Sequence, residues 1–401
     1  MSEPEAPQRK RLLGLLRVGV ALAILAWVAF SLPWDDRLTL DVGEEGTSAL
    51  GRIEGDWKSD EVAFSFLPDE TLSADWPEEA RGALERRSAL SVERRSAGAD
   101  GYDWQPSITR AFRDMDRRGL GIAMALFVGA TFLCSTRWWR LLHLARCPTT
   151  WFNALRLTYI GFCFNLVMPG MTGGDLVKGV IAAKENPRRR ADAVVSVVID
   201  RVIGLVALAM LAVFVILLSG DTFQALRTPL LGLLAFVGVG AALYANKPLR
   251  RKLGLSALVD RLPLQEKLRS LDDAALTYLK HPWEVALAFV LSFVNHLIVC
   301  WGVFHLARAI GIGPSQAGLR EFLVLAPVAN IVSSIPLAPG GWGLGEFVYR
   351  ELFEMIGLSG ALGVAVSVTF RLCNLLGLGF LGSLFLLVPG VRAEVTSTRE
   401  A

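Results

Sequence analysis

Two acidic residues follow clusters of proline and glycine, and the next apolar segment after each of them contains an arginine. Asp175 precedes Arg201 by 26 residues, and Glu346 precedes Arg371 by 25. If these segments span a membrane, an ionisable side chain within them is costly and usually faces a partner or a polar cavity. We therefore expect Asp175 to pair with Arg201 and Glu346 with Arg371, although crossed pairs would satisfy the same charges.

These groups could recognise an anion. Arginine presents a planar fork of donors that binds phosphate bidentately, and a helix that begins within an apolar region adds backbone donors and a favourable dipole. A simpler role is also open, because an acid at the start of a helix caps its N-terminus. The candidate substrate-binding residues are Asp175, Arg201, Glu346 and Arg371, with the residues of the two breaks: Pro169, Gly173, Gly174, Pro339, Gly340 and Gly341.

The composition indicates an all-α polytopic membrane protein. Hydrophobic residues make up 53% of the chain and the mean hydropathy is +0.44, too apolar for a soluble globular protein of this length. Runs of about 20 apolar residues are long enough to cross a bilayer. Six full spans are predicted, over 12–32, 119–136, 192–219, 228–245, 283–307 and 360–388, and two further apolar stretches, 151–184 and 321–357, contain the proline and glycine clusters.

The two interrupted stretches are predicted to be re-entrant hairpins. A helix broken within the bilayer must be covered by protein or line a cavity. Short segments rich in Lys and Arg, 137–146 and 184–190, flank the first stretch on both sides, which favours a cytoplasmic location for both of its ends. Three predicted crossings separate the hairpins, so the second enters from the opposite face and the pair forms an inverted repeat. Both termini are then cytoplasmic, in a plasma membrane (the bacterial inner membrane).

The segment 33–118 lies outside the membrane in this topology. It holds 20 Asp and Glu against 12 Lys and Arg, a formal charge of −8. Alternating sequences at 37–42, 49–53 and 61–66 predict short strands, and 75–90 predicts a helix with Asp75 as its N-cap. We expect a small α+β extracytoplasmic insertion, which is a candidate surface for an extracytoplasmic protein partner.

The chain divides into four predicted parts. These are a cytoplasmic N-terminus with the first transmembrane anchor (1–32), the acidic insertion (33–118), a transmembrane domain (119–388) and a cytoplasmic tail (389–401). None of the five cysteines lies in the insertion, and their spacing fits neither a zinc site nor a CxxC motif. We predict no catalytic residue, no metal or other cofactor, and no nucleic-acid partner; membrane lipids with anionic head groups are the expected partners.

Two regions resemble the signature regions of the lysylphosphatidylglycerol synthase transmembrane-region family, also called flippase-like proteins. They are NLVMPGMTGGDLVKGVIAAK with RADAVVSVVIDRVIGL, and SSIPLAPGGWGLGEFVYRELF with VSVTFRLCNLLGLGFLG. The resemblance covers about 119–388. In the namesake synthases this region is associated with moving an aminoacylated phospholipid between leaflets, while a separate soluble domain makes that lipid.

The resemblance implies a translocase for an anionic phospholipid or a lipid-linked head group. The tail 389–401 is too short to be a catalytic domain, so synthase activity is not expected, and the insertion 33–118 departs from the family pattern, so the same lipid is not implied. Two alternatives are an integral-membrane lipid-modifying or glycosyl-transfer enzyme (or its accessory subunit) and a membrane scaffold without transport.

Overall fold

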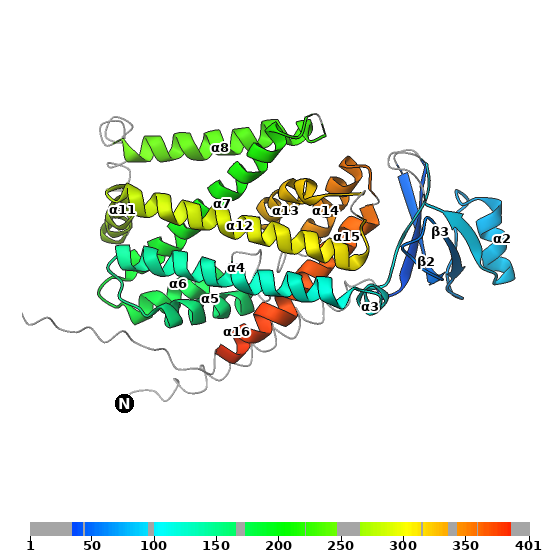
Figure 1. Ribbon diagram of the computed structural model, residues 1–401, viewed down its shortest axis with the longest axis horizontal. Coiled ribbons are helices and arrows are strands. Elements are labelled where there is room, and N and C mark those ends of the chain that lie inside the picture. Colours follow the sequence, from blue (N-terminus) through cyan, green and yellow to red (C-terminus); the bar gives the residue numbers. More distant parts are fainter. Residues whose placement is uncertain are drawn as a thin grey trace, which may run out of the picture.

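A five-stranded sheet lies at one end of a mostly helical body (Figure 1). The computed structural model describes residues 34–42, 45–94, 100–165, 173–220, 222–246, 265–313, 316–335, 343–358 and 360–385. The predicted first span, 12–32, and the predicted tail, 389–401, lie outside the described residues.

The predicted insertion contains an antiparallel sheet of order β4-β3-β2-β1-β5. Along most of its strands buried side chains, such as Leu38 and Leu40, alternate with more exposed ones, as expected for a sheet with one covered face. All three predicted strands are present. The five strands are β1 (Asp36–Val42), β2 (Glu45–Glu54), β3 (Glu61–Phe66), β4 (Leu90–Glu93) and β5 (Gly101–Gln105).

The helix of this sheet domain, α2 (Glu78–Arg86), is shorter than predicted. Asp75 does not cap it: the Asp75 carboxylate accepts a hydrogen bond from Ser73 Oγ at 3.0 Å, and Pro77 occupies the N-cap position. Lys58 of the sheet domain lies close to the start of the helical body, and its Nζ donates to the Asp114 carbonyl oxygen at 2.9 Å. The amide of Asp116, the next residue but one, donates to the Ala309 carbonyl oxygen at 3.0 Å.

Five helical segments of the described residues are long and apolar enough to cross a membrane, which agrees with a multi-pass membrane protein. The last, Leu362–Phe385, begins within α15 (Gly360–Leu372) and continues through a π-helical turn η1 (Cys373–Gly379) and α16 (Phe380–Phe385). The other four are α4 (Arg117–Leu144), α7 (Arg190–Leu217), α8 (Gln224–Ala245) and α12 (Pro282–Ile310).

The predicted end of the second span, at residue 136, is too early. Helix α4 continues to Leu144, and Arg137 lies buried within it. Four basic or polar side chains lie close together in the segment 137–146. The helix continues through it because Trp138, Leu141 and Leu142 form a buried apolar face.

The two interrupted stretches form pairs of short helices. The first pair is α5 (Trp151–Asn165) and α6 (Gly173–Glu185), and the second is α13 (Leu319–Ser333) and α14 (Leu344–Met355). A helix of 15 residues rises about 22 Å, less than the hydrocarbon thickness of about 30 Å. In Figure 1, α5 and α6 lie in the left half of the body, whereas α13 and α14 lie near the sheet domain.

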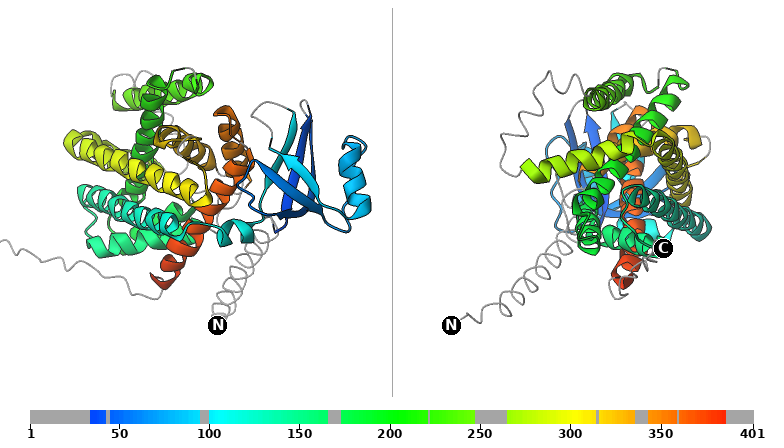
Figure 2. Two further views of the ribbon diagram at one scale, coloured as in Figure 1. Left: turned by 45° about the vertical axis from the view of Figure 1, so that its right-hand side comes forward. Right: turned by 90° about the vertical axis from the view of Figure 1, so that its left-hand side faces the viewer.

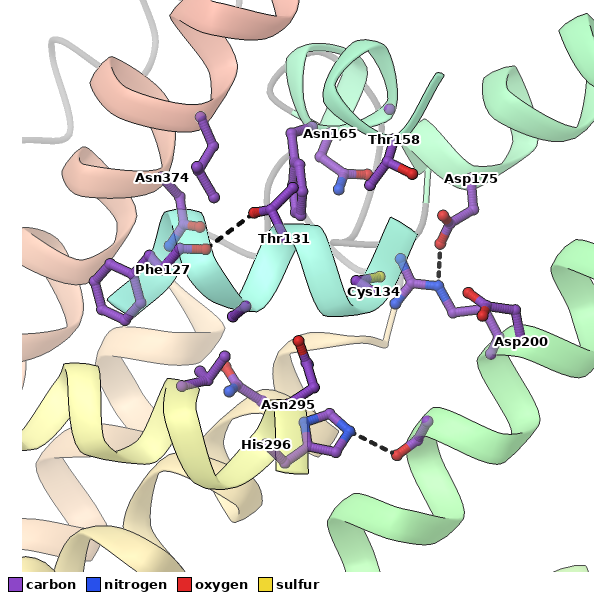
Figure 3. A pocket seen from close by; sticks show the side chains of 18 of the residues that line it. Phe127, Thr131, Cys134, Thr158, Asn165, Asp175, Asp200, Asn295, His296 and Asn374 are labelled. Carbon is purple, nitrogen blue, oxygen red and sulfur yellow. Dashed lines mark hydrogen bonds and ion pairs between the residues drawn. The ribbon is translucent and has the colours of Figure 1, made fainter. Parts of the chain in front are cut away.

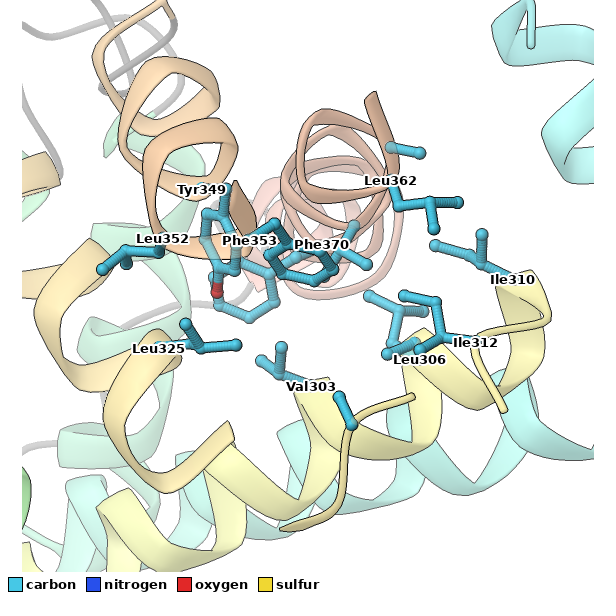
Figure 4. Close-up of a cluster of buried hydrophobic side chains, with 14 of the residues drawn as sticks. Val303, Leu306, Ile310, Ile312, Leu325, Tyr349, Leu352, Phe353, Leu362 and Phe370 are labelled. Carbon is cyan, nitrogen blue, oxygen red and sulfur yellow. The ribbon is translucent and has the colours of Figure 1, made fainter. Parts of the chain in front are cut away.

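Two further helices complete the described chain, α3 (Ile108–Arg113) before α4 and α11 (Gln265–Leu279) before α12. Figure 2 shows the helical body from two other directions, with α15 and α16 crossing it beside α4. The second helix pair is held by a buried apolar cluster, in which Phe353 and Phe370 meet Val303 and Leu306 of α12 (Figure 4). On the first pair, Leu176 and Val180 of α6 are exposed, as expected for side chains that face lipid.

Candidate functional site

A cavity of about 210 Å³ lies among the helices of the body. Helices α4, α5, α6, α7 and α12 line it together with α13, α15 and η1, so residues far apart in the sequence meet there (Figure 3). Its volume is below the about 300–1,000 Å³ of pockets for drug-sized ligands. It therefore suits a head group better than a whole lipid.

A chain of five alternating charges forms one wall of the cavity. Arg201 Nε donates to Asp175 Oδ2, and Lys178 Nζ lies 3.3 Å from Asp175 Oδ1. Lys178 Nζ also lies 3.7 Å from Asp200 Oδ2, and Arg137 Nε donates to Asp200 Oδ1 at 2.7 Å. Each carboxylate is therefore placed between two cations.

The members of this chain differ in exposure. The side chains of Lys178, Asp200 and Arg137 are 2%, 3% and 7% exposed, whereas that of Asp175 is 16% and that of Arg201 is 36% exposed. The Lys178 ammonium also lies 4.1 Å from the centre of the Trp138 ring, a cation–π contact. Arg201 is thus the cation of the chain that a ligand reaches most easily.

The close packing of α5 against α6 holds Asp175 in place. A Cβ on Gly174 would collide with the Gly161 carbonyl oxygen, so only glycine permits this approach of the two backbones. The Gly174 amide donates to Asn165 Oδ1 at 2.6 Å. The Asp175 carboxylate, in the first turn of α6, pairs with Arg201 and Lys178, so its role extends beyond the start of the helix.

Glu346 and Arg371 also form an ion pair, with Arg371 Nε 2.8 Å from Glu346 Oε1. Ser367 Oγ donates to the same carboxylate oxygen at 3.3 Å, and the Gly343 amide donates to Glu346 Oε2 at 2.5 Å. Glu346 therefore both caps α14 and pairs with an arginine. Neither Glu346 nor Arg371 lines the 210 Å³ cavity.

The remaining cavity wall carries no formal charge and combines apolar side chains, such as Phe162 and Leu208, with hydrogen-bonding ones. Asn295 is 9% exposed, and its Oδ1 has no hydrogen-bond partner among the described residues. The His296 ring lies in the same wall and donates from Nε2 to the Gly204 carbonyl oxygen at 2.9 Å. The uncharged hydrogen-bonding side chains of the lining include Thr131, Thr158, Asn165, Asn295, Asn330, Ser334 and Asn374.

The pairings are direct and not crossed: Asp175 meets Arg201, and Glu346 meets Arg371. Gly173 and Gly174 begin α6. Pro169, Pro339, Gly340 and Gly341 lie outside the described residues.

Sequence reasoning missed three charged residues of the cavity, Arg137, Lys178 and Asp200. Two of them carried a usable signal. Lys178 follows Asp175 by three positions, a spacing at which side chains on a helix are neighbours, and Asp200 directly precedes Arg201. Arg137 lies just beyond the predicted span 119–136, in a segment whose basic residues indicate the end of a span.

The family model for the lysylphosphatidylglycerol synthase TM region matches residues 99–382. The chain belongs to this family. It is 24% identical over 300 residues to a UPF0104 membrane protein of Pyrococcus horikoshii, across 68% of this chain and 88% of that protein. It is 22% identical over 151 residues to a UPF0104 membrane protein of Methanothermobacter thermautotrophicus, across 35% of this chain and 44% of that protein.

No solved structure matches the chain. The family match covers both helix pairs and every described residue of the cavity wall. It begins at residue 99, so most of the sheet domain precedes it. The family membership and the helices together show a multi-pass membrane protein.

Proposed function

We propose that the protein translocates an anionic phospholipid or a lipid-linked head group between the two leaflets. The observation that carries this proposal is the cavity with three cationic side chains, enclosed by helices long enough to cross a membrane. Charged side chains inside a membrane are costly, and they mark substrate pathways more often than they serve as inert structure. The family membership supports the same function.

The phosphate contact is assigned to Arg201. It is the most exposed member of the charge chain, and a guanidinium holds two phosphate oxygens at once. Asp175 orients it from the first turn of α6. In this proposal Glu346 and Arg371 hold the second helix pair together and do not touch the substrate, and we assign no catalytic residue.

The proposed topology is an inverted repeat in a plasma membrane. The pair α5 and α6 would open toward the cytoplasm and the pair α13 and α14 toward the outside, with 33–118 outside and both termini cytoplasmic. Transporters of this kind bind substrate where interrupted helices meet near the middle of the bilayer. The separation of the two pairs in Figure 1 supports this arrangement.

Reconstitution into liposomes tests the proposal. Purified protein should speed the movement of an acyl-labelled anionic phospholipid to the outer leaflet, measured by the fraction of label that a membrane-impermeant quencher reaches. The double substitution Asp175→Ala with Arg201→Ala removes both partners of one pair and leaves no carboxylate without a cation, so it should fold but lose translocation.

The matched control is Glu346→Ala with Arg371→Ala, which removes the pair outside the cavity. Among variants that fold, this control should keep most of the translocation rate. Full activity in the Asp175 and Arg201 double variant would contradict the assigned site.

A further inference from the structure

The cavity has a charged end and an uncharged end. Figure 3 places Asp175 and Asp200 at one side of the view and Asn374 with Phe127 at the other, and Thr131 lies between them. The five charged side chains of the described lining come from α4, α6 and α7, whereas Asn374 of η1 lies at the opposite side and Asn295 of α12 lies between the two sides in this view. This division bears on the substrate class and rests on the proposed function.

The charged end carries one surplus positive charge. Arg137, Lys178 and Arg201 face the two carboxylates of Asp175 and Asp200, and with His296 counted as neutral the formal charge of the described lining is +1. Both carboxylates are already placed between cations. A buried surplus charge is costly until an opposite charge neutralises it. One negative charge neutralises this wall, two negative charges overcompensate it, and a zwitterion leaves it unchanged.

Apart from Asp175 and Asp200, the described lining holds no carboxylate that could pair with an ammonium group. Asparagine and threonine side chains both donate and accept hydrogen bonds, which matches hydroxyl groups. Asn295 is 9% exposed, and its Oδ1 has no hydrogen-bond partner among the described residues. A buried acceptor without a donor is unfavourable, so a hydroxyl of the ligand fits this position.

The π-helical turn η1 contributes side chains to the uncharged end of the cavity. It lies within the last membrane-crossing segment and brings Asn374 and Leu378 into the cavity wall. Asn374 Nδ2 donates to the Phe370 carbonyl oxygen at 2.8 Å, which fixes the orientation of its amide. Single π-helical turns within α-helices are frequent at functional sites.

We propose that the cavity selects a phosphodiester lipid with a single negative charge and an uncharged, hydroxyl-bearing head group. The phosphate lies against Arg201 and the surplus charge of the wall, and the hydroxyl groups meet Asn295 and Asn374. The cavity volume of about 210 Å³ admits one such head group.

The test compares three acyl-labelled probes in liposomes at about pH 8, where a phosphomonoester with a second pKa of about 6 is a dianion. Phosphatidylglycerol is a monoanion with hydroxyl groups, phosphatidylethanolamine is a zwitterion, and phosphatidic acid is the dianion. Phosphatidylglycerol should move faster than the other two by about tenfold, which is the effect of leaving one buried polar group mispaired. Equal rates for all three would overturn the inference while leaving the proposed function standing. Movement of none of them, in folded protein, would refute the proposed function itself.

A charge substitution sharpens the test. Asn295→Asp keeps the shape of the side chain and lowers the formal charge of the wall to zero, so the preference should shift toward phosphatidylethanolamine. Asn295→Ala removes the amide without changing the charge, and it should slow phosphatidylglycerol while keeping its advantage. If Asn295→Asp does not fold, Asn330→Asp makes the same charge change at another position of the lining. An unchanged preference in a folded aspartate variant would overturn the inference.

Discussion

The two interrupted helix pairs have the same arrangement of an acid and an arginine, but they differ in the number of charged side chains around that ion pair. Both place an acid in the first turn of the returning helix and pair it with an arginine of a membrane-crossing segment. In the first pair this contact belongs to a chain of five charges that lines a cavity. In the second pair it stands outside the cavity, with Ser367 and the Gly343 amide as additional donors.

Two positions account for the difference. Three residues after the acid, the first pair has Lys178 and the second has Tyr349; directly before the arginine, the first has Asp200 and the second has Phe370. Lys178 and Asp200 extend the charges to Arg137 on α4, whereas Tyr349 and Phe370 join the buried apolar cluster of Figure 4. One pair thus supplies a polar site, and the other supplies packing around a single ion pair.

The largest expected effect concerns the side of the membrane at which the two ends of each helix pair lie. In a background without the five native cysteines, Lys184→Cys at the end of α6 should react with an impermeant maleimide only from the cytoplasmic side. Gln316→Cys, just before α13, should react only from the outside, because the inverted repeat puts the bases of the two pairs on opposite faces. Both positions are exposed. Labelling of both from the same side would abolish the inverted repeat.

The next effect concerns stability. Arg137→Ala leaves Asp200 with only Lys178 in a nearly closed site, and breaking a buried ion pair typically costs about 3–5 kcal/mol. Arg371→Ala should cost less, about 1–3 kcal/mol, because Glu346 keeps Ser367 and the Gly343 amide. Unfolding in detergent, followed by tryptophan fluorescence against denaturant, measures both. Equal losses would show that the two ion pairs are energetically alike.

The smallest effect concerns Tyr349. Its side chain is 2% exposed, and its hydroxyl has no hydrogen-bond partner among the described residues. Burying a hydroxyl without a partner is unfavourable, so Tyr349→Phe should leave the free energy of unfolding unchanged or raise it by up to about 1 kcal/mol. The same denaturant measurement applies, and a clear loss of stability would show that the hydroxyl is hydrogen-bonded in the protein.

The sequence was most informative where one strong pattern acts alone. The spans followed from long apolar runs, the strands from alternation, and the two ion pairs from the cost of a charge in an apolar segment. Arg137 was missed because a cluster of tryptophan and arginine is typical of the end of a span. The helix continues past it because Trp138 is buried against its neighbours. Lys178 and Asp200 carried local signals beside Asp175 and Arg201, but the contacts that join them to each other and to Arg137 lie between separate helices, which no local pattern in one sequence reveals.

We propose that Arg201 binds the head group and that Arg371 does not. Replacing either arginine by lysine keeps the charge but loses the planar fork that binds two phosphate oxygens. The most direct measurement is the initial rate of phosphatidylglycerol translocation in liposomes by Arg201→Lys and Arg371→Lys, each compared with the unaltered protein at equal folded amount. We expect a loss of about tenfold or more for Arg201→Lys, equivalent to about 1.4 kcal/mol or more, and less than a twofold change for Arg371→Lys. Equal rates for the two variants, or a loss confined to Arg371→Lys, would contradict it.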